Sequence, residues 1–248
     1  MSSASQLMAD TRKTFPLKLS LGIAFSFGIY LAVLSLSSEE TNNGLSFFIA
    51  TFGGLTAILS FYYILRKHLV KSLLKLALIF FLARLSLGVL HYLLFFDSNY
   101  FFVNYTDFNY LDEYLWLFDS MDMFAAGTAG TADADTVAGY ADQNKNYEMI
   151  FLMSFLFYFG GTKALTVATF NSLVTVYAAF IVYLISIKVN KDVKNGIFCF
   201  LIVLIQPFEM ITSILSRDTF GQMMVCYSAF LLVYFFSGRL LFFSSKLL

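Results

Sequence analysis

Apolar runs of about twenty residues recur along this chain of 248 residues, and most charged residues lie between the runs. A helix needs about 20 apolar residues to cross the ~30 Å hydrocarbon layer of a bilayer. The hydrophobic fraction of 59% is also more than a small soluble core can bury. The pattern therefore predicts an all-α fold, a polytopic bundle of transmembrane helices.

The runs define six predicted spans: Leu17–Leu36, Leu45–Leu65, Leu73–Phe96, Ala164–Ile187, Gly196–Leu215 and Phe220–Phe236. The first run is too long for a signal-peptide core and lacks a cleavage site, so we expect a retained signal anchor. A shorter apolar piece, Met149–Phe159, is predicted to be re-entrant or interfacial. The pairs Gly53-Gly54 and Gly160-Gly161 would permit close contact between helices.

The basic residues give these spans a direction. If the N-terminus is cytoplasmic, twelve of the sixteen Lys and Arg residues fall inside: Arg12, Lys13, Lys18, Arg66, Lys67, Lys71, Lys75, Lys188, Lys191, Lys194, Arg239 and Lys246. Basic residues resist translocation, so the sequence predicts a multi-pass protein with both termini cytoplasmic, in the plasma or inner membrane if the source is bacterial. The expected order is a cytoplasmic tail (1–16), three spans (17–96), an outer loop (97–148) and a second membrane half (149–248).

The outer loop is the long polar segment of the chain and carries ten acids against one lysine. Its first half is aromatic (FFVNYTDFNYLDEYLWLFD), and the spacing over Tyr110–Phe118 predicts a helix lying on the bilayer surface. Its second half (AAGTAGTADADTVAGYADQNKN) is small and polar, which is typical of a mobile loop.

Asp112 and Glu113 are the carboxylates that the sequence singles out, with Asp107 as a further candidate on the same loop. Neighbouring aromatic rings can desolvate a carboxylate and raise its pKa, which suits a general base. The competing interpretation is the solvated face of a surface helix. Asp133 and Asp135 have the spacing of a metal-binding DxD, but an acidic flexible loop produces the same pattern.

Three cations could meet those acids or a phosphate. Arg217 is either a local ion pair with Asp218 or a planar fork that grips a lipid phosphate. Arg84 lies inside a predicted span, where an arginine is costly unless it is paired or faces a cavity. Lys163 either neutralises a phosphate at the outer interface or extends its amine to water.

Other site chemistry is not indicated. Cys199 and Cys226 fall in predicted spans without metal-ligand spacing, and we interpret them as small buried hydrophobes. No metal site and no cofactor are predicted, although a divalent metal is compatible with the acids, and no nucleic-acid partner is expected.

Three segments resemble the GT-C class of membrane glycosyltransferases. They are FLMSFLFYFGGTKALTVATFNSLVTVYAAFIVYLISIKV, LIVLIQPFEMITSILSRDTFGQMMV and LARLSLGVLHYLLFFDSNYF with the later DFNYLDEYLW. The likeness covers roughly Leu73 to Phe236 and consists of hydrophobic spacing with a Gly turn, a polar span, a Pro-containing span and an outer Arg-Asp. Two spans precede this stretch, and many members of the class continue through several more.

The resemblance implies sugar transfer from a polyprenyl-phosphate donor on the extracytoplasmic face, as in glycan biosynthesis. By position, Asp107 or the pair Asp112 and Glu113 would match the acid of the first outer loop, and Arg217 the outer cation. The alternative is a non-enzymatic membrane subunit that docks a membrane protein partner through its outer loop. A transporter is less favoured, because inverted repeats and pairs of broken helices are absent from the sequence.

Overall fold

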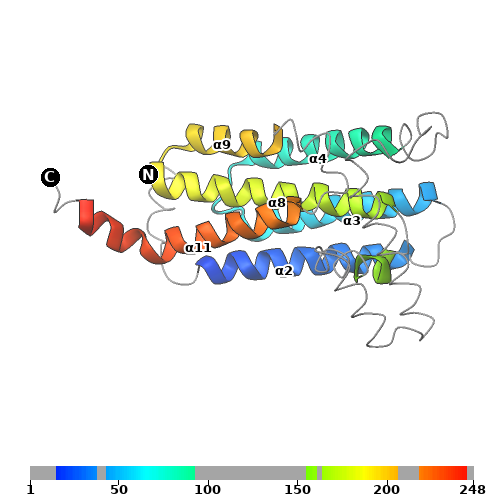
Figure 1. Ribbon diagram of the computed structural model, residues 1–248, viewed down its shortest axis with the longest axis horizontal. Coiled ribbons are helices and arrows are strands. Elements are labelled where there is room, and N and C mark those ends of the chain that lie inside the picture. The colour runs from blue at the N-terminus through cyan, green and yellow to red at the C-terminus, as the bar shows by residue number, and fades with distance from the viewer. Residues whose placement is uncertain (1–14, 38–42, 93–154, 161–163, 206–217, 245–248) are drawn as a thin grey trace, which may run out of the picture.

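The computed structural model describes residues 15–37, 43–92, 155–160, 164–205 and 218–244. Within these ranges every regular element is a helix, and there is no strand. Figure 1 shows the long helices side by side in an elongated bundle. The predicted all-α class is therefore confirmed for the described part of the chain.

The helices follow the apolar runs closely. In chain order they are α2 (Phe15–Leu34), the 3₁₀ turn η1 (Ser35–Ser37), α3 (Asn43–Leu65), α4 (Lys71–Tyr92), α8 (Ala164–Asn190), α9 (Val193–Ile205) and α11 (Asp218–Ser244). Residues 155–160 form a further short helix that overlaps the end of the predicted interfacial piece, Met149–Phe159.

Three stretches of helix are long and apolar enough to cross a membrane: Phe15–Ser37, Gly44–Leu65 and Thr166–Asn190. They coincide with the predicted first, second and fourth spans and are compatible with a multi-pass membrane protein. Helix α4 carries three basic residues and is not among them, while α9 and the apolar part of α11 are shorter. The count of six spans therefore stays a prediction.

The surface of the bundle is apolar where a soluble protein would be polar. Phe25, Phe48, Phe198 and Val225 are 61%, 69%, 64% and 69% exposed. Contiguous exposed apolar surface of this kind is a liability in water but suits a hydrocarbon surround. The outer faces of α2, α3, α9 and α11 thus support a membrane setting.

Helix α8 is the centre of the bundle. It packs against α3, α4, α9 and α11, and Figure 1 shows it between them. Within the bundle, 78% of its spanning window is buried, compared with 28% for the first span and 39% for the second. Protein therefore replaces lipid around most of α8, which permits polar side chains along it.

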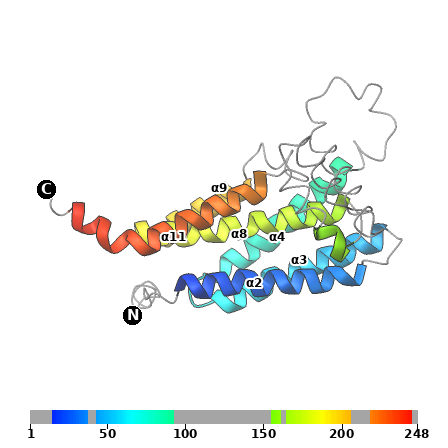
Figure 2. The same cartoon turned by 60° about the horizontal axis from the view of Figure 1, so that its bottom comes forward.

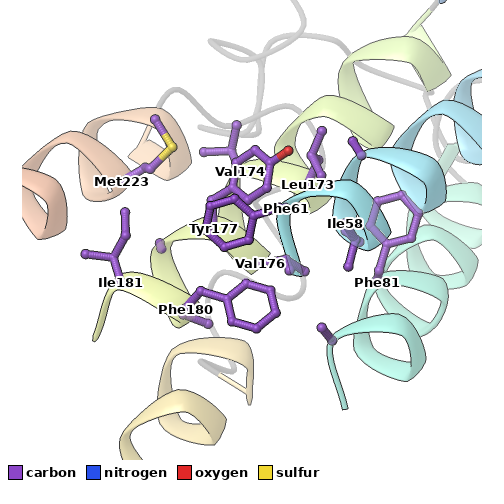
Figure 3. Packing of buried hydrophobic residues seen from close by; sticks show 14 of the residues in the cluster. Ile58, Phe61, Phe81, Leu173, Val174, Val176, Tyr177, Phe180, Ile181 and Met223 are labelled. Atoms are coloured by element: carbon purple, nitrogen blue, oxygen red, sulfur yellow. The ribbon is translucent and has the colours of Figure 1, made fainter. Parts of the chain in front are cut away.

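A series of tilted aromatic rings joins α8 to its neighbours. The ring of Phe61 in α3 lies 5.0 Å from that of Tyr177 and 5.3 Å from that of Phe180, both in α8. Phe180 then meets Phe200 of α9 at 5.2 Å. Figure 3 shows Phe61, Tyr177 and Phe180 clustered, with Phe81 beyond Ile58 on the other side of α3. Ring pairs at these separations add to the burial of their area.

Glycines allow close approaches between helices. A Cβ at Gly54 in α3 would overlap the tip of the Phe81 ring of α4. A Cβ at Gly196 in α9 would lie 3.0 Å from the Tyr183 ring of α8. Of the predicted contacts at glycine pairs, those at Gly53, Gly54 and Gly160 are confirmed, since a Cβ at Gly53 would lie 3.2 Å from Val33 and one at Gly160 would lie 2.9 Å from Leu34.

The two described tight connections lie at one end of the bundle, beside the start of α2. Residues 66–70 join α3 to α4, and residues 191–192 join α8 to α9. The ring of Phe15 in α2 lies 4.3 Å from that of His68 and 5.3 Å from that of Tyr234 in α11. The amine of Lys188 in α8 lies 4.9 Å from the centroid of the same Tyr234 ring.

Candidate functional site

The opposite end of the bundle is the one to which the acidic loop is attached. Figures 1 and 2 both show α4 and α8 running antiparallel, so the end of α4 lies on the same side as the start of α8. The segment 93–163 connects these two helix ends. We call this side of the bundle the loop end.

Arg84 is the predicted site residue that the structure describes. It lies in α4, eight residues before the helix ends at Tyr92, and is 4% exposed. It is the only buried charged side chain among the described residues. An arginine at the centre of a membrane helix costs about 2.5–3.5 kcal/mol, so a buried one is a functional candidate by default.

Polar side chains line the N-terminal half of α8, also toward the loop end. Thr166, Thr169, Asn171, Ser172 and Thr175 are all buried. Three of their hydroxyls donate to backbone carbonyls of α8 itself: Thr169 to Thr166 at 2.7 Å, Ser172 to Ala168 at 2.8 Å and Thr175 to Asn171 at 2.9 Å. Those protons are already used, so these three hydroxyls could meet a ligand only as acceptors.

Tyr30 of α2 forms hydrogen bonds with part of this polar stretch. Its hydroxyl lies 2.8 Å from the hydroxyl of Thr169 and 3.3 Å from the carbonyl of Thr166. Because Thr169 donates to the Thr166 carbonyl, the single proton of Tyr30 is shared between the Thr169 oxygen and that same carbonyl. This corner is thus a satisfied network that holds α2 to α8.

The start of α11 brings a polar group that the sequence did not single out. Thr219 is 1% exposed, and its hydroxyl has no hydrogen-bond partner among the described residues. The ring of Phe220 stacks 6.4 Å from that of Phe170, which holds this turn against the polar half of α8. Sequence alone gave no signal, because a threonine early in an apolar helix is ordinary.

The remaining predicted site residues lie outside the described residues. This applies to the loop acids Asp107, Asp112 and Glu113 and to the cations Lys163 and Arg217. The predicted surface helix and the Asp133–Asp135 motif lie outside them as well. Convergence of the acids with Arg217 therefore stays a prediction.

The described residues offer no metal centre. No group of three or more His, Cys, Asp or Glu side chains gathers in the described ranges. Cys199 in α9 and Cys226 in α11 are partly buried and form no disulfide.

Comparisons of the chain with protein-family models, with curated proteins and with solved structures found no match.

Proposed function

We propose that this chain is an integral membrane protein of the glycosyltransferase type, which transfers a sugar from a lipid-phosphate donor at the extracytoplasmic face. The observation that supports this best is the burial of Arg84 in a bundle with an apolar exterior. A guanidinium is costly in such surroundings unless it meets polar or anionic groups, and an anionic donor phosphate is one such group.

Chain connectivity adds a second line of support. Lys163 immediately precedes α8, and Arg217 immediately precedes α11, whose first turn packs on Phe170. Asp97 follows the end of α4 by five residues. The described helix ends that these residues adjoin in the sequence all lie toward the same half of α8, which supports the proposal.

In the proposed reaction, a carboxylate of Asp107, Asp112 or Glu113 takes the proton of an acceptor hydroxyl. The acceptor oxygen attacks the anomeric carbon of the sugar while the bond to the lipid phosphate breaks, which inverts that carbon. The Arg217 guanidinium offsets the charge on the departing phosphate, with Arg84 and Lys163 contributing positive potential.

The test is sugar transfer by purified protein in lipid discs, supplied in turn with polyprenyl-phosphate donors carrying different labelled sugars. Asp112→Asn and Glu113→Gln should abolish transfer, and Arg217→Lys should weaken donor use because a point charge replaces a fork. Asp133→Asn is the matched control, since it removes one charge from the other half of the same loop. Full activity in all three site variants would disprove the site.

The alternative is a non-enzymatic subunit, and the same preparation distinguishes it. In that case the wild-type protein transfers no sugar from any donor and co-purifies with a stable membrane partner. Replacing Asp112 and Glu113 by amides should then release the partner, because the acidic aromatic loop would be the docking surface.

A further inference from the structure

Basic side chains from three separate segments gather at the end of the bundle opposite the loop end. Their common feature is position, within about one turn of a helix end at this side. They are Lys18 of α2, Arg66, Lys67, Lys71 and Lys75 around the α3–α4 connection, and Lys188, Lys191 and Lys194 around the α8–α9 connection. We call these eight residues the basic end.

Aromatic contacts bring the three segments together. Phe15 at the start of α2 meets His68 of the α3–α4 connection at 4.3 Å. Phe15 also stacks on Tyr234 of α11, and Lys188 of α8 lies over that ring at 4.9 Å. The basic end is therefore one surface, and its charges reinforce one another's potential.

Almost no acid neutralises it within the described residues. Among the side chains that the structure describes, that of Asp192 is the only carboxylate. One of its oxygens accepts a hydrogen bond from the backbone N–H of Lys194 at 3.0 Å. Seven of the eight cations are exposed, and Lys188 is half-buried. In the described part of the chain, eight cations thus lie near one carboxylate, and an external anion would offset that excess of positive charge.

The surface directly beside these cations is apolar. Leu17 and Leu21 flank Lys18 and are 61% and 59% exposed, and Ile79, one turn beyond Lys75, is 61% exposed. Arg66 stacks over the ring of Tyr63 at 4.5 Å, and that ring is 65% exposed. A soluble acidic partner would leave this apolar border unmatched, whereas a phospholipid offers a phosphate and acyl chains at the matching heights.

We propose that the basic end binds the headgroups of anionic phospholipids, with their acyl chains along the exposed apolar surfaces of α2 and α4. The contact orients the bundle in the bilayer and is independent of any sugar transfer. Each Lys or Arg near an anionic surface strengthens attachment roughly fivefold, so a cluster selects anionic over zwitterionic lipid strongly.

The test measures which lipids stay with the protein. Wild-type protein is placed in bilayers of equal parts phosphatidylglycerol and phosphatidylcholine, excised with a disc-forming polymer, and its lipids are quantified. The triple variant Lys67→Gln, Lys71→Gln and Lys75→Gln removes three charges from one segment. The matched control changes the same three residues to Arg, which keeps the charge.

We expect phosphatidylglycerol to be enriched severalfold over the bulk ratio with the wild type and with the Arg variant, and much less with the Gln variant. If the Gln variant does not fold, wild type in 1 M salt supplies the measurement, because a Debye length of about 3 Å should remove the enrichment. Lipids at the bulk ratio around the wild type would overturn the proposal. Equal enrichment by the Gln variant would overturn it too.

Discussion

The hydroxyl of Tyr177 in α8 donates a 2.7 Å hydrogen bond to the hydroxyl of Ser26 in α2, although the two residues lie 151 positions apart. The direction is fixed, because the single proton of Ser26 goes to the carbonyl of Ile23 at 3.0 Å. Both side chains are buried. Helix α2 packs mainly against α3, and this bond, the one from Tyr30 and the 5.6 Å contact between the Phe27 and Phe170 rings hold it to the central helix.

Tyr177→Phe should therefore lower the free energy of unfolding by about 1 kcal/mol, and Ser26→Ala by about 1–3 kcal/mol, because the alanine leaves the buried tyrosine proton without an acceptor. Denaturant titration of the detergent-solubilised protein, followed by circular dichroism, measures both. Tyr158→Phe is the control, since that ring is 69% exposed. Equal losses in the Tyr177 and Tyr158 variants would show that the bond contributes nothing.

The contact of Gly54 with Phe81 gives a second prediction. Gly54→Ala should destabilise the protein by about 1–3 kcal/mol, because the added methyl overlaps a buried ring. Combining it with Phe81→Leu should recover part of the loss by shortening that side chain. Gly28→Ala is the matched control: nothing lies within 4 Å of a Cβ there, so helix propensity should make it neutral or stabilising. Identical effects at both glycines would contradict this.

The junction between α8 and α9 predicts a gain in stability. Lys191 directly follows α8 with a φ of 56°, and its N–H donates to the carbonyl of Ile187 at 2.9 Å. A side chain at such a φ costs about 1 kcal/mol that glycine avoids. Lys191→Gly should thus be more stable than Lys191→Ala by about that amount, with the loss of charge the same in both. Thermal unfolding of the two variants measures the difference.

The predicted orientation can be tested by labelling single cysteines in cells. Cys199 and Cys226 are first changed to Ala, and cysteine is then placed at Ser98 or Thr128 in the outer loop, or at Lys67. An impermeant maleimide should label the loop positions in intact cells and Lys67→Cys only after the membrane is opened. Labelling in the reverse pattern would refute cytoplasmic termini, because those positions lie on opposite sides of the predicted topology.

The length of an apolar run was enough to locate the helices. The ends of the predicted runs Leu17–Leu36 and Leu45–Leu65 differ from the ends of α2 and α3 by two residues at most. The agreement arises because an apolar run has to match the thickness of the hydrocarbon layer, and polar or charged residues follow where the helix leaves that layer. In the fifth predicted span, Gly196–Leu215, the structure describes helix from Val193 to Ile205, and the rest of that run lies outside the described residues.

The packing around α8 was not predictable in the same way. Five Thr, Ser and Asn residues lie from Thr166 to Thr175, but no single sequence says which tyrosine will meet which hydroxyl. Tyr30 and Thr169 are 139 positions apart, and their pairing depends on how α2 and α8 pack within the bundle. For the candidate site, the free-energy cost of placing an arginine in hydrocarbon pointed to Arg84, and the structure shows that its side chain is buried. The loop acids have no such constraint from hydrocarbon, and they stay predictions.

The burial of α8 by its neighbouring helices also has a consequence for biosynthesis. Helix α8 is made before α9 and α11, so on leaving the insertion machinery it has only part of its cover, from α2, α3 and α4. Until α11 arrives, the face that will receive Met223 and Phe220 is open to lipid or to membrane chaperones. A newly made chain whose last helix docks slowly would expose that face to quality-control proteases, so substitutions in α11 should reduce cellular yield more than they reduce the stability of the finished protein.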